Sequence, residues 1–277
     1  MTARKPDTRI VQRGRGHSYL LDGQKVDGVT TVTNNGVPKP QLIKWAADQT
    51  WKYAIDHWAE LTELPLSERI SRMEGARFDT LREASERGTE VHTQIVRYLA
   101  GEPVEPPAGL EGHVDAAIAF VEAWQLDELL VETPVFSREW GYAGKPDAVA
   151  RLAGYPDDVW LLDWKTHARG PFIESALQLA AYRYADFYVV DGELDEDGRV
   201  IEHPMGDLGI TRTGIVHVKA DEALLYPFDA GADAFVVFGA VQQVAAFVGS
   251  TRESWIGDAL RPPEPEPELE LADEAAA

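Results

Sequence analysis

The pattern of apolar and polar residues has a helical period through the first half of the chain. Apolar residues recur at about every third or fourth position over 40–60, 67–100 and 110–126, which predicts three successive helices. The second of these is expected to end where Gly101 and Pro103 interrupt the pattern.

The period changes to two after the third helix. Residues 129–138, 142–152 and 159–166 read as strands, the last of them with an apolar run typical of a strand covered on both faces. Gly141 and the turn-forming stretch 154–158 leave only short connections between them. Because parallel strands need a long crossover, such connections predict an antiparallel meander of three strands.

The remaining elements complete a mixed fold. A helix is predicted over 174–190, a strand over 213–219 and a last helix over 232–248. Near the start, β-branched runs on either side of Asp22-Gly23, within 17–33, predict a small hairpin. The order of these elements predicts an α/β (α+β) protein in which a central mixed sheet is flanked by helices.

The composition indicates a folded protein and excludes every site that needs cysteine. The 277 residues are 44% apolar, which suits a sizeable buried core, and none of them is cysteine. Disulfides, thiolate zinc sites, cysteine-ligated iron–sulfur clusters and cysteine nucleophiles are thereby excluded. Apolar runs stay shorter than about 18 residues and the start carries no secretory signal, so we expect a soluble cytoplasmic protein without a membrane partner.

The net charge of −21 is unevenly distributed. We expect a basic amino-terminal arm over 1–16, a single folded domain over 17–255, and an acidic, Pro/Glu-rich, disordered tail over 256–277. The arm has the charge to follow a phosphate backbone, although a merely solvated terminus has the same composition. The overall acidity argues against non-specific coating of nucleic acid, because such binding needs a basic surface, but it leaves room for a restricted catalytic groove.

Charged residues at one end of the predicted meander carry the first chemical signal. Asp163 and Lys165 are two apart on a strand and therefore face the same side, whereas Trp164 faces a helix on the other side. Asp147 falls at the same end of the neighbouring strand. Two converging carboxylates form an oxygen-lined site suited to Mg²⁺ or Mn²⁺, although an Asp-x-Lys pair taken alone is usually an ordinary ion pair.

Four short motifs follow one another in a fixed order along the chain. They are Gly88-x-x-x-His92, Gly144-Lys-Pro-Asp147, Asp163-x-Lys165-Thr166 and Gln178-x-x-x-Tyr182. This set resembles the PD-(D/E)XK nuclease superfamily, and more narrowly the RecB-like nuclease domain and its stand-alone, phage-type exonuclease relatives. The resemblance extends over roughly residues 15–250 and implies a restriction-endonuclease-like core.

The resemblance implies a catalytic set made of Asp147, Asp163 and Lys165. His92 and the two aspartates would be the ligands of a catalytic Mg²⁺ or Mn²⁺, joined by the backbone carbonyl of Trp164. Lys165 would position or activate the attacking water.

Further residues are expected to surround this set. Those that would support the site and the DNA are Gln178, Tyr182, Thr166, Lys145 and Gly88. Glu132, on the preceding strand, is a candidate for an additional metal ligand and equally a candidate for an edge-strand surface charge.

The lack of cysteine separates this chain from some of those relatives. Several of them hold an iron–sulfur cluster with four cysteines, which this sequence cannot do. A Gly-x-x-x-x-Gly-Lys-Ser/Thr phosphate loop is also missing from the sequence, so the helicase motor of other relatives is not expected here.

The leading hypothesis from the sequence is a metal-dependent DNA exonuclease in recombination, repair or phage DNA metabolism. Its partner would be DNA, and a recombinase or single-strand-annealing protein is a further candidate. A structure-specific endonuclease would use the same chemistry. Two non-catalytic alternatives stay open, namely a nuclease-like module that binds DNA ends or a protein partner, and an acidic DNA mimic.

Overall fold

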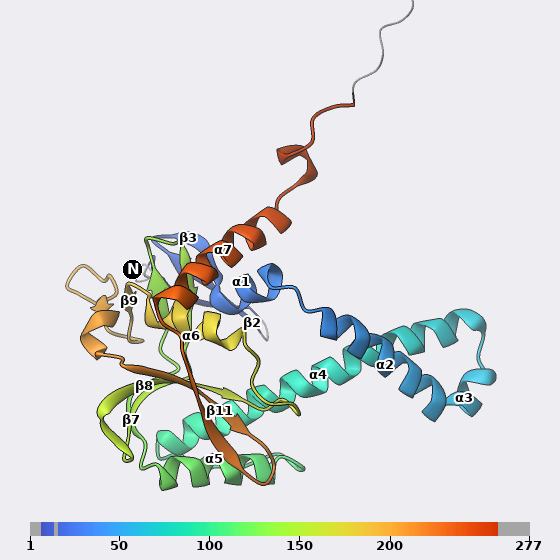
Figure 1. Cartoon of the computed structure of the whole chain (residues 1–277), viewed down its shortest axis with the longest axis horizontal. Coiled ribbons are helices and arrows are strands. Elements are labelled where there is room, and N and C mark those ends of the chain that lie inside the picture. Colours follow the sequence, from blue (N-terminus) through green and yellow to red (C-terminus); the bar gives the residue numbers. More distant parts are fainter. Residues whose placement is uncertain (1–6, 14–15, 260–277) are drawn as a thin grey trace, which may run out of the picture.

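Two mixed β-sheets flanked by helices make up the protein (Figure 1). The computed structural model describes residues 7–13 and 16–259. The α+β class and the central mixed sheet predicted from the sequence are confirmed. The helices are α1 (Val29–Gly36), α2 (Pro40–Asp56), α3 (Trp58–Thr62), α4 (Leu66–Leu99), α5 (Glu111–Ala123), α6 (Ser175–Arg183) and α7 (Ala232–Val248), with short 3₁₀ helices η1 (Met205–Leu208) and η2 (Arg252–Ser254).

Two of the predicted helices differ from the structure in their extent. The helix predicted over 40–60 is broken at His57, whose backbone (φ −115°, ψ 21°) is not helical, so that α2 and α3 are separate. The helix predicted over 174–190 ends at Arg183, because the chain then turns into a short strand. The helices α4, α5 and α7 lie within two or three residues of their predicted bounds.

Helix α1 was not predicted. Its sequence is rich in β-branched valine and threonine, which favour strands. Packing outweighs this preference, because Val29 and Val32 are buried in the core. Gly36, at the end of α1, lies so close to Val241 of α7 that a Cβ there would overlap the carbonyl oxygen of that residue.

The five-stranded sheet contains the predicted meander. Strands β4, β7 and β8 are neighbours and antiparallel, as predicted, and β11 joins β8 in parallel. The edge strand β12 was not predicted, because its proline and its partly exposed residues weaken the strand pattern. In sheet order the strands are β12 (Ala223–Phe228), β11 (Arg212–Val218), β8 (Tyr155–Lys165), β7 (Ala148–Leu152) and β4 (Asp127–Val131).

The seven-stranded sheet includes the predicted hairpin. Strands β2 and β3 are joined by a tight turn in which Asp22 and Gly23 both have positive φ (50° and 80°), the geometry of a two-residue hairpin loop. In sheet order the strands are β1 (Arg9–Arg13), β2 (Gly16–Leu21), β3 (Gln24–Gly28), β6 (Tyr142–Gly144), β5 (Val135–Ser137), β9 (Phe187–Tyr188) and β10 (His203–Pro204).

The prediction of two continuous strands over 129–138 and 142–152 was wrong. Each is divided between the two sheets, the first into β4 and β5 and the second into β6 and β7. The first break falls at Glu132, which adopts a left-handed backbone (φ 47°) uncommon for a residue with a side chain. The second falls at 145–147. The chain therefore crosses from sheet to sheet twice at one place, where the Glu132 N–H donates a hydrogen bond to the Asp147 carbonyl (3.0 Å).

The core has a layer on each face of β8. Trp160, Leu162 and Trp164 project into one cluster with α5 and the second half of α4, while Leu161 projects into the other with α6 and α7. The apolar run of β8 is thus covered on both faces, as predicted. Figure 1 also shows α2, α3 and the first half of α4 projecting from the body as a helical arm.

The predictions for the two ends of the chain were an amino-terminal arm and an acidic tail. Residues 9–13, expected to belong to a basic arm, form β1 and pair with β2, so the folded part begins before residue 17. Most of the expected acidic tail, 260–277, lies outside the described residues, as do 1–6 and 14–15. Within the described ranges, every helix is too short or too polar to cross a membrane.

Candidate metal centre

The register of two neighbouring strands brings the two aspartates together. Ala148 of β7 pairs with Leu162 of β8, so Asp147 and Asp163 lie side by side where β7 begins and β8 ends. Both carboxyl groups are buried, at 8% and 2% exposure. The Trp164 N–H donates a hydrogen bond to Asp147 Oδ2 (2.6 Å) and so fixes the orientation of that carboxylate.

Helix α4 supplies the histidine. Its buried residues Val91 and Ile95 hold this part of α4 against the sheet and turn His92 toward the aspartates. The ring Nε2 donates a hydrogen bond to the Trp164 carbonyl (2.9 Å), and Nδ1 lies 3.4 Å from Asp147 Oδ1. The carbonyl predicted as a ligand is therefore in direct contact with the histidine ring.

Glu132 completes the cluster from the crossing between the sheets. Its Oε1 lies 4.0 Å from His92 Nδ1. One ligand atom from each of Glu132, His92 and Asp147 lies within 4.8 Å of the others, a spacing at which one cation can bind all three. The Glu132 side chain is 23% exposed and forms an ion pair with Lys145.

Lys165 and Gln178 hold the second aspartate. The Lys165 ammonium forms an ion pair with Asp163, as expected for residues two apart on a strand. Gln178 Nε2, on α6, donates hydrogen bonds to Asp163 Oδ1 (2.9 Å) and to the Tyr182 hydroxyl (3.0 Å) one helical turn later. The Gln/Tyr motif thus reaches the carboxylate directly.

The glycines of the motifs mark close approaches. A Cβ at Gly88 of α4 would lie 3.4 Å from the Thr166 hydroxyl, so the helix passes next to the end of β8. A Cβ at Gly144 would overlap the ring of Tyr182. All the residues predicted from the motifs therefore lie in or beside one cluster.

The ionisation of the cluster follows from burial and from mutual attraction. Burial, opposed by Lys165 and reinforced by Asp147, raises the pKa of Asp163 to about 6. Burial alone would raise the pKa of Asp147 and lower those of His92 and Lys165. The charges of the cluster outweigh it, so the pKa of Asp147 is lowered and those of His92 and Lys165 are raised. Without a bound metal ion, the cluster therefore contains the Asp163 carboxyl, whose ionisation is disfavoured by burial, beside the Lys165 ammonium.

The donor set suits a hard divalent cation. It consists of carboxylate oxygens, a backbone carbonyl and one imidazole, without the thiolates that favour zinc or iron–sulfur clusters. Asp163 Oδ2 is fully buried, and the Lys165 ammonium is its ion-pair partner.

Comparison with known proteins assigns no family. No family model matches the sequence, and no curated protein sequence matches it. The evidence for a function therefore comes from the buried charged cluster around Asp147 and Asp163 and from the residues that surround it.

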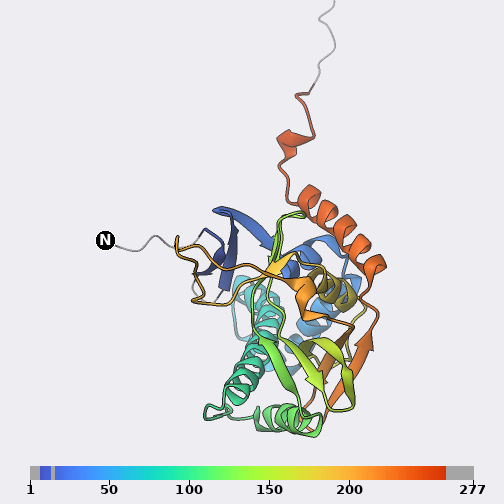
Figure 2. The same cartoon turned by 90° about the vertical axis from the view of Figure 1, so that its left-hand side faces the viewer.

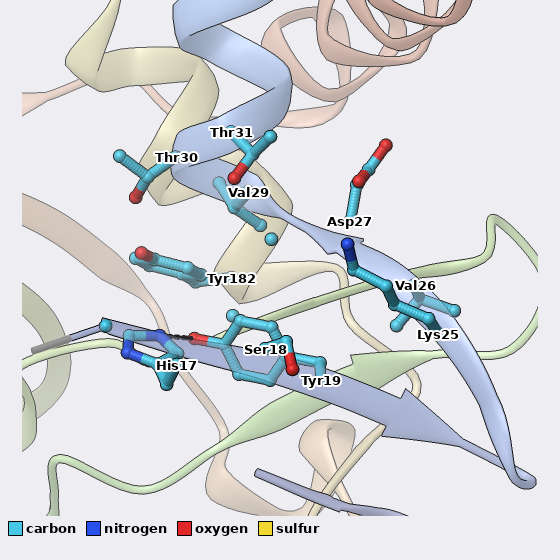
Figure 3. Close-up of a pocket in the computed structure, with 13 residues that line it drawn as sticks. His17, Ser18, Tyr19, Lys25, Val26, Asp27, Val29, Thr30, Thr31 and Tyr182 are labelled. Carbon is cyan, nitrogen blue, oxygen red and sulfur yellow. Dashed lines mark hydrogen bonds between the residues drawn. The ribbon is translucent and has the colours of Figure 1, made fainter. Parts of the chain in front are cut away.

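A cavity of about 550 Å³ adjoins the cluster. Figure 3 shows the ring of Tyr182 between the first turn of α1 (Thr30) and strand β2 (His17 and Tyr19), with Lys25 on the far side. His17 Nε2 lies 2.8 Å from the Tyr19 hydroxyl. Tyr182 belongs both to this cavity and to the Gln178 hydrogen-bond chain, so this side chain connects the cavity wall to Asp163.

Sequence reasoning selected Tyr182 and Gly144 of this cavity but missed its other wall. Thr30 and Thr31 lie on the helix that was interpreted as strand, and His17 and Lys25 lie on a hairpin that precedes all four motifs in the sequence. The sequence offered one signal for this wall, the polar stretch that precedes α1. The β-branched residues of α1 favour a strand and so concealed the start of the helix.

Proposed function

We propose that this protein is a metal-dependent deoxyribonuclease of the PD-(D/E)XK type, and more specifically an exonuclease. The observation that carries the proposal is the cluster at the junction of the two sheets, in which the His92–Asp147 pair lies beside the Asp163–Lys165 ion pair. Four residues of these types, drawn from a helix and two strands, are not brought together by any single local pattern.

The proposed cation is Mg²⁺ or Mn²⁺, held by Asp147, Asp163, His92 and the Trp164 carbonyl, with Glu132 able to contribute. Bound there, it would screen the charge of a phosphate and lower the pKa of a water. Its affinity is expected to fall as the pH falls toward 6, because Asp163 must be ionised to bind it.

Lys165 acts as a cation in this account. Its raised pKa keeps it an ammonium at neutral pH, so it donates hydrogen bonds and does not accept a proton. It is placed to orient the attacking water and to neutralise the negative charge that develops on the phosphate oxygens. The attacking water gives up one proton to solvent as its oxygen forms a new bond to phosphorus, the bridging P–O bond breaks, and the leaving oxygen takes up a proton from solvent.

Gln178 and Tyr182 keep Asp163 oriented. The Gln178 amide donates to both, and burial raises the pKa of Tyr182, which therefore stays a neutral phenol. Asp147 is oriented independently by the Trp164 N–H. Because each carboxylate accepts a hydrogen bond from a different donor, both would keep a fixed orientation as metal ligands. Such fixed positioning raises the rate of the catalysed reaction.

DNA has to approach an acidic protein at a restricted place. The cavity that shares Tyr182 with the hydrogen-bond chain of Asp163 is lined by Lys25, His17 and the hydroxyls of Thr30 and Thr31 as well as by the Asp27 carboxylate, and it is of the size found for small ligands. We infer weak DNA binding without metal, because most of the surface repels phosphate. The proposed setting is the cytoplasm of a bacterial or phage-infected cell, with a recombinase or annealing protein as partner.

The chief alternative is a nuclease-like module that binds DNA ends without cleaving them. A non-catalytic module has no need for an ammonium beside the buried carboxylates, and the cost of burying these charges favours the enzyme.

Cleavage of linear and of closed-circular duplex DNA, each with Mg²⁺, Mn²⁺ or EDTA, tests the proposal. We expect metal-dependent loss of linear DNA only, absent in Asp163→Asn and retained in Asp157→Asn, an exposed aspartate at the other end of the same strand. Nicking of circles would indicate an endonuclease. DNA binding without cleavage in either metal would indicate the silent module and contradict the proposal.

A further inference from the structure

Helix α7 has few polar residues although it lies at the edge of the molecule. Residues 234–251 contain no charged residue in a chain of net charge −21, and their polar side chains within the helix are Gln242 and Gln243. In Figure 2 the helix runs along the outside of the body. A helix this apolar is normally buried on most sides, so the outer side of α7 requires an explanation.

The inner side of α7 packs against the body of the protein. Phe238, Gly239 and Ala245 are buried against α1, α6 and the loop before β6. A Cβ at Gly239 would overlap the ring of Trp140, which shows how closely this side is packed.

The outer side of α7 is exposed and apolar. Among the described residues, none covers it. It consists of Val236, Val237, Ala240, Val244, Phe247 and Val248, spaced three, four or one apart as a stripe that the exposed Gln243 borders. Trp255 extends the stripe, because its ring packs against Phe247 (centroids 5.0 Å apart) and is itself 67% exposed. We call this set, with Ile256, the α7 face.

The exposed area of the α7 face is large for a monomer. Its large side chains are between 48% and 69% exposed. Taking about 150–250 Å² for a fully exposed aromatic side chain and less for valine and isoleucine, they present on the order of 600 Å² of apolar surface. The largest apolar patch on a typical monomer is about 300–600 Å², and a standard protein interface buries about 800 Å² on each partner.

The stripe is symmetric along the helix. About a midpoint at residue 242, Val236 corresponds to Val248, Val237 to Phe247, and Ala240 to Val244. Two copies of α7 running antiparallel would therefore place an apolar residue opposite every member of the stripe, with the small Ala240 allowing close approach. A two-fold axis through this midpoint generates such an arrangement.

We propose that the α7 face is the interface of a homodimer in which the α7 helices of two copies pack antiparallel. Charge favours this place for self-association, because two copies of an acidic chain repel each other least where neither carries a charge. The inference is independent of the proposed nuclease activity, since none of the α7 face belongs to the metal cluster or the cavity.

Measurement of molar mass by light scattering during size-exclusion chromatography tests this proposal. The parent is expected at twice the mass of the chain at micromolar concentration. Val244→Glu would place two carboxylates near the axis and is expected to weaken association by on the order of a hundredfold. Ile173→Glu, at an 86% exposed apolar residue elsewhere, is the matched control and should stay dimeric. A monomeric parent, or a dimer unaffected by Val244→Glu, would overturn the proposal.

The absence of cysteine from the sequence allows the direction of pairing to be tested in the folded full chain. Val237→Cys and Phe247→Cys are made separately and treated with a short bismaleimide. Antiparallel pairing predicts efficient cross-linking only when the two variants are mixed. Cross-linking of each variant with itself, or none in the mixture, would overturn the antiparallel arrangement. Circular dichroism of each variant checks that it is folded.

Discussion

Replacement of Asp163 by asparagine is expected to stabilise the metal-free protein at neutral pH while destroying the candidate metal centre. The Asp163 carboxyl is 2% exposed, and burial raises its pKa to about 6 from an ordinary value of 3.8. At neutral pH the folded protein therefore holds an ionised carboxylate where the neutral form is preferred. A shift of that size corresponds to at most about 3 kcal/mol of unfolding free energy.

The pH dependence has a definite sign. Because the folded-state pKa is above the unfolded-state value, the stability contributed by protonated Asp163 is fully present below about pH 4 and is lost as the pH rises through about 6. Asparagine is neutral at every pH and can still accept the hydrogen bond from Gln178. Lys165 loses one partner but keeps the attraction of Asp147. The variant should match the parent near pH 4 and exceed it by roughly 1–3 kcal/mol at pH 7.5.

Urea unfolding in EDTA, followed by circular dichroism across this pH range, measures the difference. Asp157→Asn, the exposed control on the same strand, should remain within about 0.5 kcal/mol of the parent throughout. Added Mn²⁺ should stabilise the parent and the control but not Asp163→Asn, because only a protein that binds the ion in its folded state gains from it. If the variant is less stable than the parent at pH 7.5, or the difference does not change with pH, the reasoning about this carboxyl is refuted.

Three further substitutions test other parts of the account. Gly144→Ala should cost about 1–3 kcal/mol in urea unfolding, because the new Cβ overlaps the buried Tyr182 ring, and unchanged stability would contradict this packing. Leu161→Ala, at a fully buried position of β8, should cost about 2–5 kcal/mol in the same assay, and a loss below about 1 kcal/mol would mean that β8 is not central to the core. His92→Gln should weaken Mn²⁺ binding in calorimetry by more than the about 10–100-fold typical of residues that only support a ligand, whereas unchanged affinity would remove His92 from the ligand set.

The local part of the site could be predicted from the sequence. Asp163 and Lys165 share a face because the side-chain period of a strand is two, and Asp147 lies beside Asp163 because a short turn fixes the hairpin register. The approach of His92 and Gln178 depends on how helices pack on the sheet. The expectation that these two residues lie beside the aspartates came from the resemblance to known nucleases, and not from the pattern of apolar and polar residues along the sequence.

The parts that were missed depend on packing between distant segments. Helix α1 has strand-like residues and is helical because it is held against α7 at Gly36. The crossing between the sheets depends on a left-handed Glu132, which the alternating pattern of residues 129–138 does not reveal. The wall of the cavity comes from a hairpin and a helix far from the motifs, so no spacing in the sequence could have indicated it.

The rate of metal-dependent cleavage by Lys165→Ala shows whether this ammonium takes part in the proposed reaction. Single-turnover cleavage of end-labelled linear duplex would be measured in saturating Mn²⁺ for the parent, Lys165→Ala and Asp157→Asn, with Mn²⁺ affinity measured on the same samples. The account predicts equal rates for the parent and Asp157→Asn, and a loss of about 100-fold or more for Lys165→Ala without a matching loss of Mn²⁺ affinity. Cleavage by Lys165→Ala at the parent rate, or no Mn²⁺-dependent cleavage by the parent, would contradict it.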